Sequence, residues 1–526
     1  MSGPAGSRRA GVLIPLFACP STKSWGVGDI GDIAPVSRWL VAAGLRVLQL
    51  LPLNEMAPGQ HSPYSATSAM AIDPIFIQMD AVLEFAALGG ERGLAFADRA
   101  RLKQARGSRR VDYETVRQLK HRALTAAFDH FCETEWVRDT ARARSLKDFL
   151  AGQAWWVEDY ACFRAIHAHL HERPWTEWPD PLQRRNPAAI GRIRRELARD
   201  VLFYQYVQWL ADLQWREARA AARANGVELL GDLPFMVNGD SADVWARQQQ
   251  FRFDASVGAP PDAFSATGQD WGVPAYRWDA VAVDDFRWLR TRARRAADLY
   301  DAFRIDHVVG FYRTYARPRD GSPAFFTPAT EEEQIALGER LIGVFREPGA
   351  GIVAEDLGTV PPFVRKSLAR LAVPGFCIFR WERRWGTPEE PFRDPVEYPE
   401  VSVAASGTHD TEPQVEWWSQ ASDEERHLVD GLPTIRHLAP GRSLLDMTED
   451  AAGDILLEAL FASTSALVLM PIADVFGWRD RINDPATMDG DNWTFRLPWP
   501  VDRLHDAPEA RARRAQLHIW SERHGR

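Results

Sequence analysis

The segment AFRIDHVVG, residues 302–310, has the apolar character of a buried strand, yet it contains an arginine, an aspartate and a histidine. Burying a charged side chain is costly unless the charge is paired or lies at an opening. Arg304 and Asp306 are two residues apart, so in a strand their side chains point to the same side and can pair. His307 points to the other side if the strand continues to it. The segment therefore predicts a strand that ends at a charged site.

Short apolar runs of the same kind recur along the chain, each bounded by polar or turn residues. There are eight of them, at residues 12–17, 46–53, 227–234, 302–308, 352–358, 376–381, 401–410 and 466–472. Helical patterns precede several runs, as at residues 36–44, 286–300 and 360–371. Nearly continuous apolar strands that alternate with helices indicate a parallel sheet buried on both faces. The sequence therefore predicts an α/β fold of the (β/α)8 TIM barrel class.

At 526 residues the chain is longer than a simple barrel, and the excess lies between the predicted strands. Residues 86–226, between the second and third runs, have a mostly helical pattern. No Ser- or Gly-rich linker separates them, so we expect helical subdomains inserted in the βα loops rather than an independent domain. We expect the catalytic barrel to span residues 10–500 and residues 1–9 to be disordered.

Composition excludes several classes of protein. With 45% hydrophobic residues, 26% charged residues and a net charge of −9, the chain resembles an ordinary globular protein and lacks the basic excess of a nucleic-acid binder. No apolar run approaches the roughly 18 residues of a membrane span. The run after the two N-terminal arginines is too short for a secretory signal. The four cysteines have no metal-ligand spacing. We therefore expect a reduced, cytoplasmic protein without nucleic-acid, membrane or metal partners.

Tryptophan is abundant, with 21 residues, several of them in pairs or near-pairs. Core packing is the ordinary explanation for any single tryptophan. The functional alternative is stacking on flat apolar faces such as those of sugar rings. The count therefore supports a carbohydrate site without locating it.

Acidic residues stand at or near the carboxyl ends of four predicted strands: Asp232, Asp306, the pair Glu355 and Asp356, and Asp410. These ends converge on one face of a parallel barrel, where barrel enzymes hold their active sites. An ion pair or a helix cap explains any one acid, but not all four strands together. Two carboxylates about 5–5.5 Å apart are what a retaining glycosidase needs, one as nucleophile and one as acid/base. Crowding of such a pair raises the pKa of one member.

Longer motifs surround these acids. They are SWGVGDIGD (24–32), SPYS (62–65), GDLPFMVNGDSADVWA (231–246), GAPPDAFSATGQDWGVPAY (258–276), FRIDH (303–307), VAEDLG (353–358), GTHD (407–410), RINDP (481–485) and NWTFRL (492–497). In these motifs the chain resembles the 4-α-glucanotransferases, the amylomaltase or disproportionating-enzyme family related to α-amylases. The resemblance runs from about residue 11 to residue 497.

The resemblance implies a retaining double displacement on maltooligosaccharides and α-1,4-glucans, without organic cofactor or metal. It implies that Asp306 is the nucleophile, that Glu355 is the general acid/base, and that Asp410 grips sugar hydroxyls and stabilises the transition state. The residues that it implies bind substrate or support the trio are Arg304, His409, Ser62, Tyr64, Asp240, Gln269, Trp271 and Asn483. The stretch from Pro261 to Gln269 resembles a mobile loop that covers the acceptor side.

The sequence also departs from the family pattern. Gly59 and the two residues after it replace a Gly-Tyr-Gly-Asp motif, so a tyrosine is lost. Where the family has a tyrosine in the covering loop, this chain has Ala263. Where the family has an arginine after the RIDH strand, this chain has Val309. Where the family begins a Gln-Asp pair in the last strand, this chain has Ala473. Because the catalytic trio is intact, we still expect activity.

Other functions fit parts of the sequence. GVGDIG (26–31) matches a dinucleotide-binding pattern, but its glycines do not directly follow a strand, as that site requires. A His-Asp pair such as His409 and Asp410 is also found in metal phosphohydrolases. That class needs further histidine ligands at fitting positions, and the sequence shows none. An α-glucan hydrolase of the amylase type would use the same trio with water as acceptor. A glucan-binding protein without catalysis would be favoured if one of the trio were missing.

Overall fold

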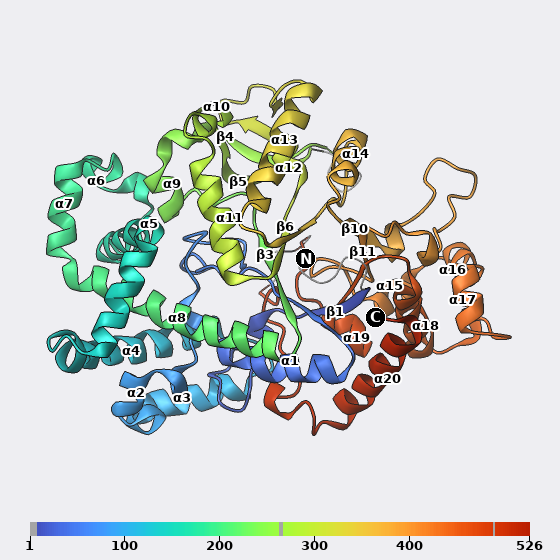
Figure 1. Cartoon of the computed structure of the whole chain (residues 1–526), viewed down its shortest axis with the longest axis horizontal. Coiled ribbons are helices and arrows are strands. Elements are labelled where there is room, and N and C mark those ends of the chain that lie inside the picture. The colour runs from blue at the N-terminus through green and yellow to red at the C-terminus, as the bar shows by residue number, and fades with distance from the viewer. Residues whose placement is uncertain (1–7, 262–266, 486, 488–489) are drawn as a thin grey trace.

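The computed structural model describes residues 8–261, 267–485, 487 and 490–526 (Figure 1). Within this part, eight parallel strands close into a barrel in the order β1-β12-β11-β10-β9-β6-β3-β2. They are β1 (Arg9–Leu13), β2 (Val47–Gln49), β3 (Glu228–Leu233), β6 (Ala302–Ile305), β9 (Gly351–Ala354), β10 (Gly375–Ile378), β11 (Ser402–Ala405) and β12 (Leu467–Pro471). Each overlaps one predicted apolar run, so the predicted (β/α)8 barrel is confirmed.

The inside of the barrel is apolar at its base and charged at the carboxyl ends of the strands. Its buried cluster consists of Val47, Leu230, Ala302, Val353, Phe376, Ile378, Val403, Ala405, Leu467 and Leu469. Side chains alternate along a strand, so the inward position after Ala302 is Arg304 and the one after Val353 is Glu355. The alternation that fills the core therefore also directs charges into the mouth of the barrel.

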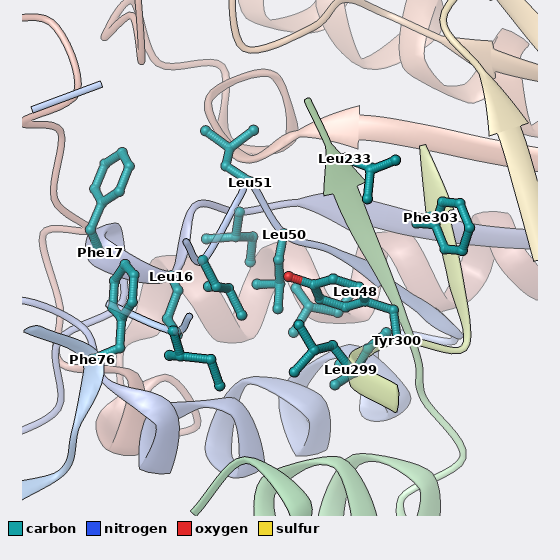
Figure 2. Close-up of a cluster of buried hydrophobic side chains, with 14 of the residues drawn as sticks. Leu16, Phe17, Leu48, Leu50, Leu51, Phe76, Leu233, Leu299, Tyr300 and Phe303 are labelled. Atoms are coloured by element: carbon teal, nitrogen blue, oxygen red, sulfur yellow. The ribbon is translucent and has the colours of Figure 1, made fainter. Parts of the chain in front are cut away.

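The outward-facing side chains pack against the surrounding helices. Figure 2 shows part of this layer, in which Leu48 and Phe303 from two strands belong to one buried cluster with Leu299 and Tyr300. The surrounding helices are α1 (Ile33–Ala42), α8 (Ala198–Ala224), α11 (Arg287–Leu299), α13 (Glu331–Arg346), α14 (Pro362–Arg370), α18 (Glu449–Ala462) and α20 (Pro508–His524). The predicted helices at 36–44, 286–300 and 360–371 correspond to α1, α11 and α14. Just beyond α1, Gly44 has φ +78°, a left-handed conformation that favours glycine and ends helices.

Between β2 and β3 the chain forms helices that lie to one side of the barrel (Figure 1). They are α2 (Leu83–Ala87), α3 (Phe96–Gly107), α4 (Tyr113–Phe131), α5 (Ala141–His169), α6 (Asp180–Gln183) and α7 (Pro187–Glu196), and α8 leads back to the barrel. At the N-terminus, β1 already begins at Arg9. The rest of the segment expected to be disordered falls mainly on residues 1–7, which lie outside the described residues.

A second sheet lies above the carboxyl face of the barrel, and the sequence did not predict it. It is antiparallel, in the order β5-β4-β7-β8, with strands β4 (Phe251–Ala259), β5 (Gln269–Tyr276), β7 (Thr314–Pro318) and β8 (Phe325–Thr327). These strands are partly exposed and carry no continuous apolar run, so they lack the sequence pattern of a buried strand. The sheet places Gln269 and Trp271 above the barrel.

The remaining helices sit in the loops of the barrel. They are α9 (Ala242–Ala246), α10 (Trp278–Val283), α12 (Val309–Tyr312), α15 (Gln414–Gln420), α16 (Asp423–Asp430), α17 (Pro433–Leu438) and α19 (Ile472–Phe476). None of the helices that the structure describes is both long enough and apolar enough to cross a membrane.

Candidate active site

Arg304 and Asp306 meet where β6 ends. The guanidinium Nη1 of Arg304 lies 2.8 Å from Asp306 Oδ1 and 2.7 Å from Asp232 Oδ2, so the predicted pairing is present. Burial by itself lowers the pKa of Arg304, but the charges of Asp232 and Asp306 overcome it and raise the pKa well above its usual value. The Arg304 side chain is 6% exposed and that of Asp306 is 29% exposed. A fixed cation therefore holds Asp306 while leaving its carboxylate open to a ligand.

His307 does not follow the alternation of β6, because the strand ends at Ile305. Its φ of 50° is left-handed, and its backbone N–H donates a 2.7 Å hydrogen bond to Glu355 Oε2. Burial lowers the pKa of the His307 ring to about 4, so the ring is neutral at pH 7. The residue that follows Asp306 therefore binds Glu355 directly through its backbone N–H.

Glu355 follows β9 and is the more buried of these two carboxylates, at 13% exposure. It accepts hydrogen bonds from the backbone N–H groups of His307 and Leu357, at 2.7 and 3.0 Å. Arg304 Nη2 lies 3.9 Å from its Oε2. Burial raises the pKa of Glu355 to about 7; Arg304 opposes this shift and Asp306 adds to it. A carboxyl with this pKa exchanges its proton near neutral pH, as a general acid/base must.

Asp356, the neighbour of Glu355, takes no part in this cluster. Its Oδ1 accepts a 2.8 Å hydrogen bond from the backbone N–H of Phe376, on the adjacent strand β10. Of the acidic pair that the sequence places after the fifth run, only Glu355 therefore joins Arg304 and Asp306.

Asp410 lies in the loop after β11 and is held by two neighbours. His409 Nε2 is 3.2 Å from its Oδ2, and Asn483 Nδ2 donates a 2.6 Å hydrogen bond to its Oδ1. Burial would raise the pKa of Asp410, but the charge of His409 and these hydrogen bonds outweigh it and lower the pKa well below its usual value. Its side chain is 41% exposed, so a permanent negative charge faces the mouth of the barrel.

Tyr64 connects the two halves of the cluster. One half contains Asp232, Arg304, Asp306 and Glu355, and the other contains His409 and Asp410. Its hydroxyl donates to Asp232 Oδ2 at 2.7 Å and lies 3.0 Å from His409 Nε2, and the Tyr64 and His409 rings stack with centroids 5.4 Å apart. Ser62 contributes from beside it, accepting a 3.3 Å hydrogen bond from the Tyr64 backbone N–H. Ser62 therefore shapes the turn that presents Tyr64.

The other expected binding residues lie farther from the carboxylates. Trp271 is 36% exposed, its ring and the His307 ring are nearly perpendicular with centroids 4.8 Å apart, and its indole N–H donates to Gln269 Oε1 at 2.9 Å. Asp240 instead faces the helical insertion, where its Oδ1 accepts from the Trp175 backbone N–H at 3.0 Å and its Oδ2 lies 3.3 Å from His167 Nε2. Trp271 thus adjoins the site through His307, and Asp240 is anchored to the insertion.

The sequence predicts no particular role for two residues of the cluster. Asp232, which the sequence marks only as an acid at a strand end, lies fully buried between Arg304 and Tyr64. Trp493 packs its ring 5.8 Å from Tyr64 and 5.7 Å from His409. It belongs to the NWTFRL motif, but nothing distinguished it among 21 tryptophans. The contacts of Asp232 and those of Trp493 both depend on closure of the barrel.

The departures from the family pattern lie in several loops of the barrel, and the structure describes three of the four positions. Beside Ala473, the buried Asp474 accepts hydrogen bonds from Ser406 Oγ at 2.5 Å and the Gln414 backbone N–H at 2.7 Å. Val309 begins α12, and Gly59 is exposed with open space around it. Ala263 and most of the expected covering loop lie outside the described residues.

The fold and the cluster define a class of enzyme: a (β/α)8 barrel with an arginine-held carboxylate beside a second carboxyl of raised pKa, as in retaining enzymes that act on α-glucans. The family model described as 4-alpha-glucanotransferase matches residues 14–502, and the chain belongs to this family. The amylomaltase-type transferase function and the enzyme class expected from the sequence are confirmed, and the hydrolase and binding-protein alternatives are not favoured.

Individual relatives agree. The chain is 32% identical to a 4-alpha-glucanotransferase of Thermus thermophilus over 95% of this chain and 97% of the relative. It is 29% identical to one of Chlamydia pneumoniae, over 95% and 93% of the two chains. Among solved structures, the amylomaltase of Streptococcus agalactiae in complex with acarbose superposes with a TM-score of 0.82 at 26% identity, covering 99% of both chains.

Proposed function

We propose that this enzyme moves α-1,4-glucan segments between maltooligosaccharides by a retaining double displacement. Asp306 is the nucleophile, Glu355 the general acid/base and Asp410 the carboxylate that stabilises the transition state. One observation carries the proposal: the Arg304 guanidinium lies between an accessible Asp306 and a mostly buried Glu355 whose pKa is about 7. This arrangement places a nucleophile bound by arginine beside an acid that still carries its proton in part at pH 7.

In the first step Asp306 attacks the anomeric carbon of a glucose unit. Its Oδ1 is held by Arg304, so Oδ2 is the oxygen that forms the new bond to carbon. The bond from that carbon to the departing oxygen breaks, and Glu355 gives its proton to this oxygen. The products are a glycosyl ester on Asp306 and a shortened glucan with a free hydroxyl group.

The second step reverses the role of Glu355. The charge of Asp306 is one cause of the raised pKa of Glu355, and ester formation removes that charge. The pKa of Glu355 therefore falls when the intermediate forms, which favours the ionised form that acts as base. Glu355 then takes the proton from an acceptor hydroxyl, that oxygen attacks the anomeric carbon, and Asp306 leaves as a carboxylate.

Asp410 keeps its charge throughout. Positive charge develops on the sugar in an oxocarbenium-like transition state, and a permanently ionised carboxylate nearby stabilises it. The hydrogen bonds from Asn483 and His409 hold Asp410 in place, and its exposed surface is available to sugar hydroxyls. The acceptor is proposed to lie under Gln269 and Trp271, where a sugar excludes water and transfer exceeds hydrolysis.

Trapping with α-maltosyl fluoride tests the assignments, because fluoride leaves without strong acid assistance. Glu355→Gln should lose activity on maltotriose but become labelled by α-maltosyl fluoride, with the adduct mapped to Asp306 by peptide mass spectrometry. Asp306→Asn should fail with both donors. An adduct on another residue, or normal turnover by Asp306→Asn, would refute the roles.

Product analysis tests the reaction type. Incubation with maltotriose should give a ladder of longer and shorter oligosaccharides with almost no gain in reducing ends, because each transfer conserves their number. A gain in reducing ends as fast as redistribution would identify a hydrolase instead.

We also propose that the enzyme works in the cytoplasm. All four cysteines are buried and free, and such thiols persist in a reducing compartment. Fractionation of cells of the source organism, with the enzyme detected by antibody, tests this location.

A further inference from the structure

A second cleft, with a volume of about 860 Å³, lies on the same face of the barrel as the carboxylates. Its walls come from three parts of the chain: residues 20–26 after β1, residues 106–110 in the insertion after β2, and, after β12, Trp478, Asp480 and residues 495–500. Each follows a strand at its carboxyl end. The proposed catalytic acids follow β6, β9 and β11, so the cleft lies on the same rim, next to β11 and across the barrel from β6 and β9.

The cleft has a rigid aromatic wall. Trp478, Phe495 and Trp499 line it, with ring centroids 5.5 Å apart between the two tryptophans and 6.2 Å between Trp478 and Phe495. Phe476 stacks on Trp478 from behind at 4.5 Å. Both tryptophans are half-buried. Such a wall offers flat apolar faces of the kind on which sugar rings pack.

The opposite wall is held by arginines that are already engaged. Arg106 pairs with Glu91, and Arg110 Nη2 lies 2.9 Å from Asp491 Oδ2. Arg496 donates to three backbone carbonyls at and just beyond the end of α3. Gly26 adds to this packing: a Cβ there would meet the carbonyl oxygen of a residue in α3 at 2.6 Å. These contacts fix the shape of the cleft, and they leave these guanidinium groups with their charges balanced or their donors used.

Two lining side chains remain available. Within the described part of the chain, neither Arg109 nor Asp480 makes a side-chain hydrogen bond or ion pair, and both are exposed in the cleft. One free positive and one free negative group give almost no net charge to attract an anion. They do give both hydrogen-bond donors and acceptors, which suits a neutral ligand rich in hydroxyl groups.

The cleft also lies close to the proposed catalytic cluster along the chain. Trp493 packs on Tyr64 and His409, and Phe495, two residues later, lines the cleft. Two residues of extended chain span at most about 7 Å. The same short segment therefore places the side chain of Trp493 in the proposed catalytic cluster and the side chain of Phe495 in the cleft.

We propose that this cleft is a second glucan-binding site, which holds a segment of α-1,4-glucan while the carboxylates act. The choice of glucan as ligand rests on the proposed function. Trp478 and Trp499 pack on the sugar faces, and Arg109 and Asp480 bind the hydroxyl groups.

Chain-length dependence tests the proposal. Trp499→Ala should raise the ratio of KM for amylose to KM for maltotriose about fivefold or more, because one aromatic–sugar contact is worth about 1 kcal/mol. Trp499→Phe should restore most of the loss. Trp385→Ala, which removes an exposed tryptophan of the loop after β10, is the matched control and should leave the ratio unchanged. An unchanged ratio in Trp499→Ala would overturn the proposal.

Direct binding separates this proposal from the catalytic one. In an Asp306→Asn background, migration through amylose-containing gels should be retarded less after Trp499→Ala, and also after Arg109→Ala, a surface change that spares the aromatic packing. Equal retardation in all variants would overturn the second site even if transfer is confirmed. If transfer fails but retardation depends on Trp499, only the catalytic proposal is lost. Binding of inorganic phosphate that disappears in Arg109→Ala would assign the cleft to anions and reject glucan.

Discussion

Glu355 and Asp410 are two carboxylates at the mouth of one barrel, and the structure gives them opposite properties. Glu355 is nearly buried, accepts hydrogen bonds from backbone N–H groups and has its pKa raised to about 7. Asp410 is far more exposed and is bound by His409 and Asn483, which lower its pKa. The difference teaches that burial and neighbouring charges, rather than residue type, separate a group that exchanges a proton from one that keeps its charge.

The largest effect should come from removing the proton-exchanging member. Glu355→Gln cannot donate or accept the proton, so kcat on maltotriose should fall by about 10²- to 10⁴-fold. The remaining rate should not vary between pH 6 and pH 8, since no group of pKa about 7 is left at that position. Steady-state kinetics over this range is the measurement. A residual rate with the wild-type pH profile would show that another group exchanges the proton.

Removing the charge-keeping member should cost less. Asp410→Asn preserves the shape but loses charge-assisted hydrogen bonds worth about 1.5–3 kcal/mol, so kcat/KM should fall by about 10- to 100-fold. Unlike Glu355→Gln, this variant should retain a fall in activity above pH 7. If Asp410→Asn abolished that pH dependence, the division of roles between the two carboxylates would be wrong.

The titration of Glu355 predicts how the activity of the unmodified enzyme changes above pH 7. The first step needs Glu355 protonated, and its pKa of about 7 means that the protonated fraction is lost as the pH rises through 7. Activity should therefore fall about tenfold per pH unit well above pH 7. Initial rates with maltotriose and with α-maltosyl fluoride provide the test. The decline should be weaker with the fluoride, which needs less acid assistance, and equal declines would contradict the assignment.

The smallest effect should come from removing the Tyr64 hydroxyl, which connects the two halves of the cluster. Tyr64→Phe removes the hydroxyl that contacts Asp232 and His409 but keeps the ring stack on His409. The loss of the hydrogen bond donated to Asp232, worth about 1 kcal/mol, predicts a roughly fivefold lower kcat/KM. Tyr312→Phe is the matched control, because its hydroxyl bonds to Ser367 away from this cluster. Identical kinetics of Tyr64→Phe and Tyr312→Phe would show that Tyr64 does not couple the halves.

Much of the part of the cluster that holds Arg304, Asp306 and Glu355 could be predicted from the sequence. Apolar runs ended in acids, and alternation along a strand put Arg304 and Asp306 on one side, where they lie 2.8 Å apart. These are local properties, since they depend only on residues a few positions apart in one strand. The eight strands of the barrel were predictable for the same reason, because each is a short buried run.

Only the tertiary structure decided the rest. Tyr64 and His409 are 345 positions apart, and closure of the barrel alone brings their side chains together. The same closure buries Asp232 between Arg304 and Tyr64 and packs Trp493 against Tyr64 and His409. The pKa values of Glu355 and Asp410 also follow from this packing, because burial and charges from other strands set them. The sequence by itself determined which chemical groups reach the mouth of the barrel. The packing decided which of them exchanges a proton, because that depends on neighbours that no local pattern specifies.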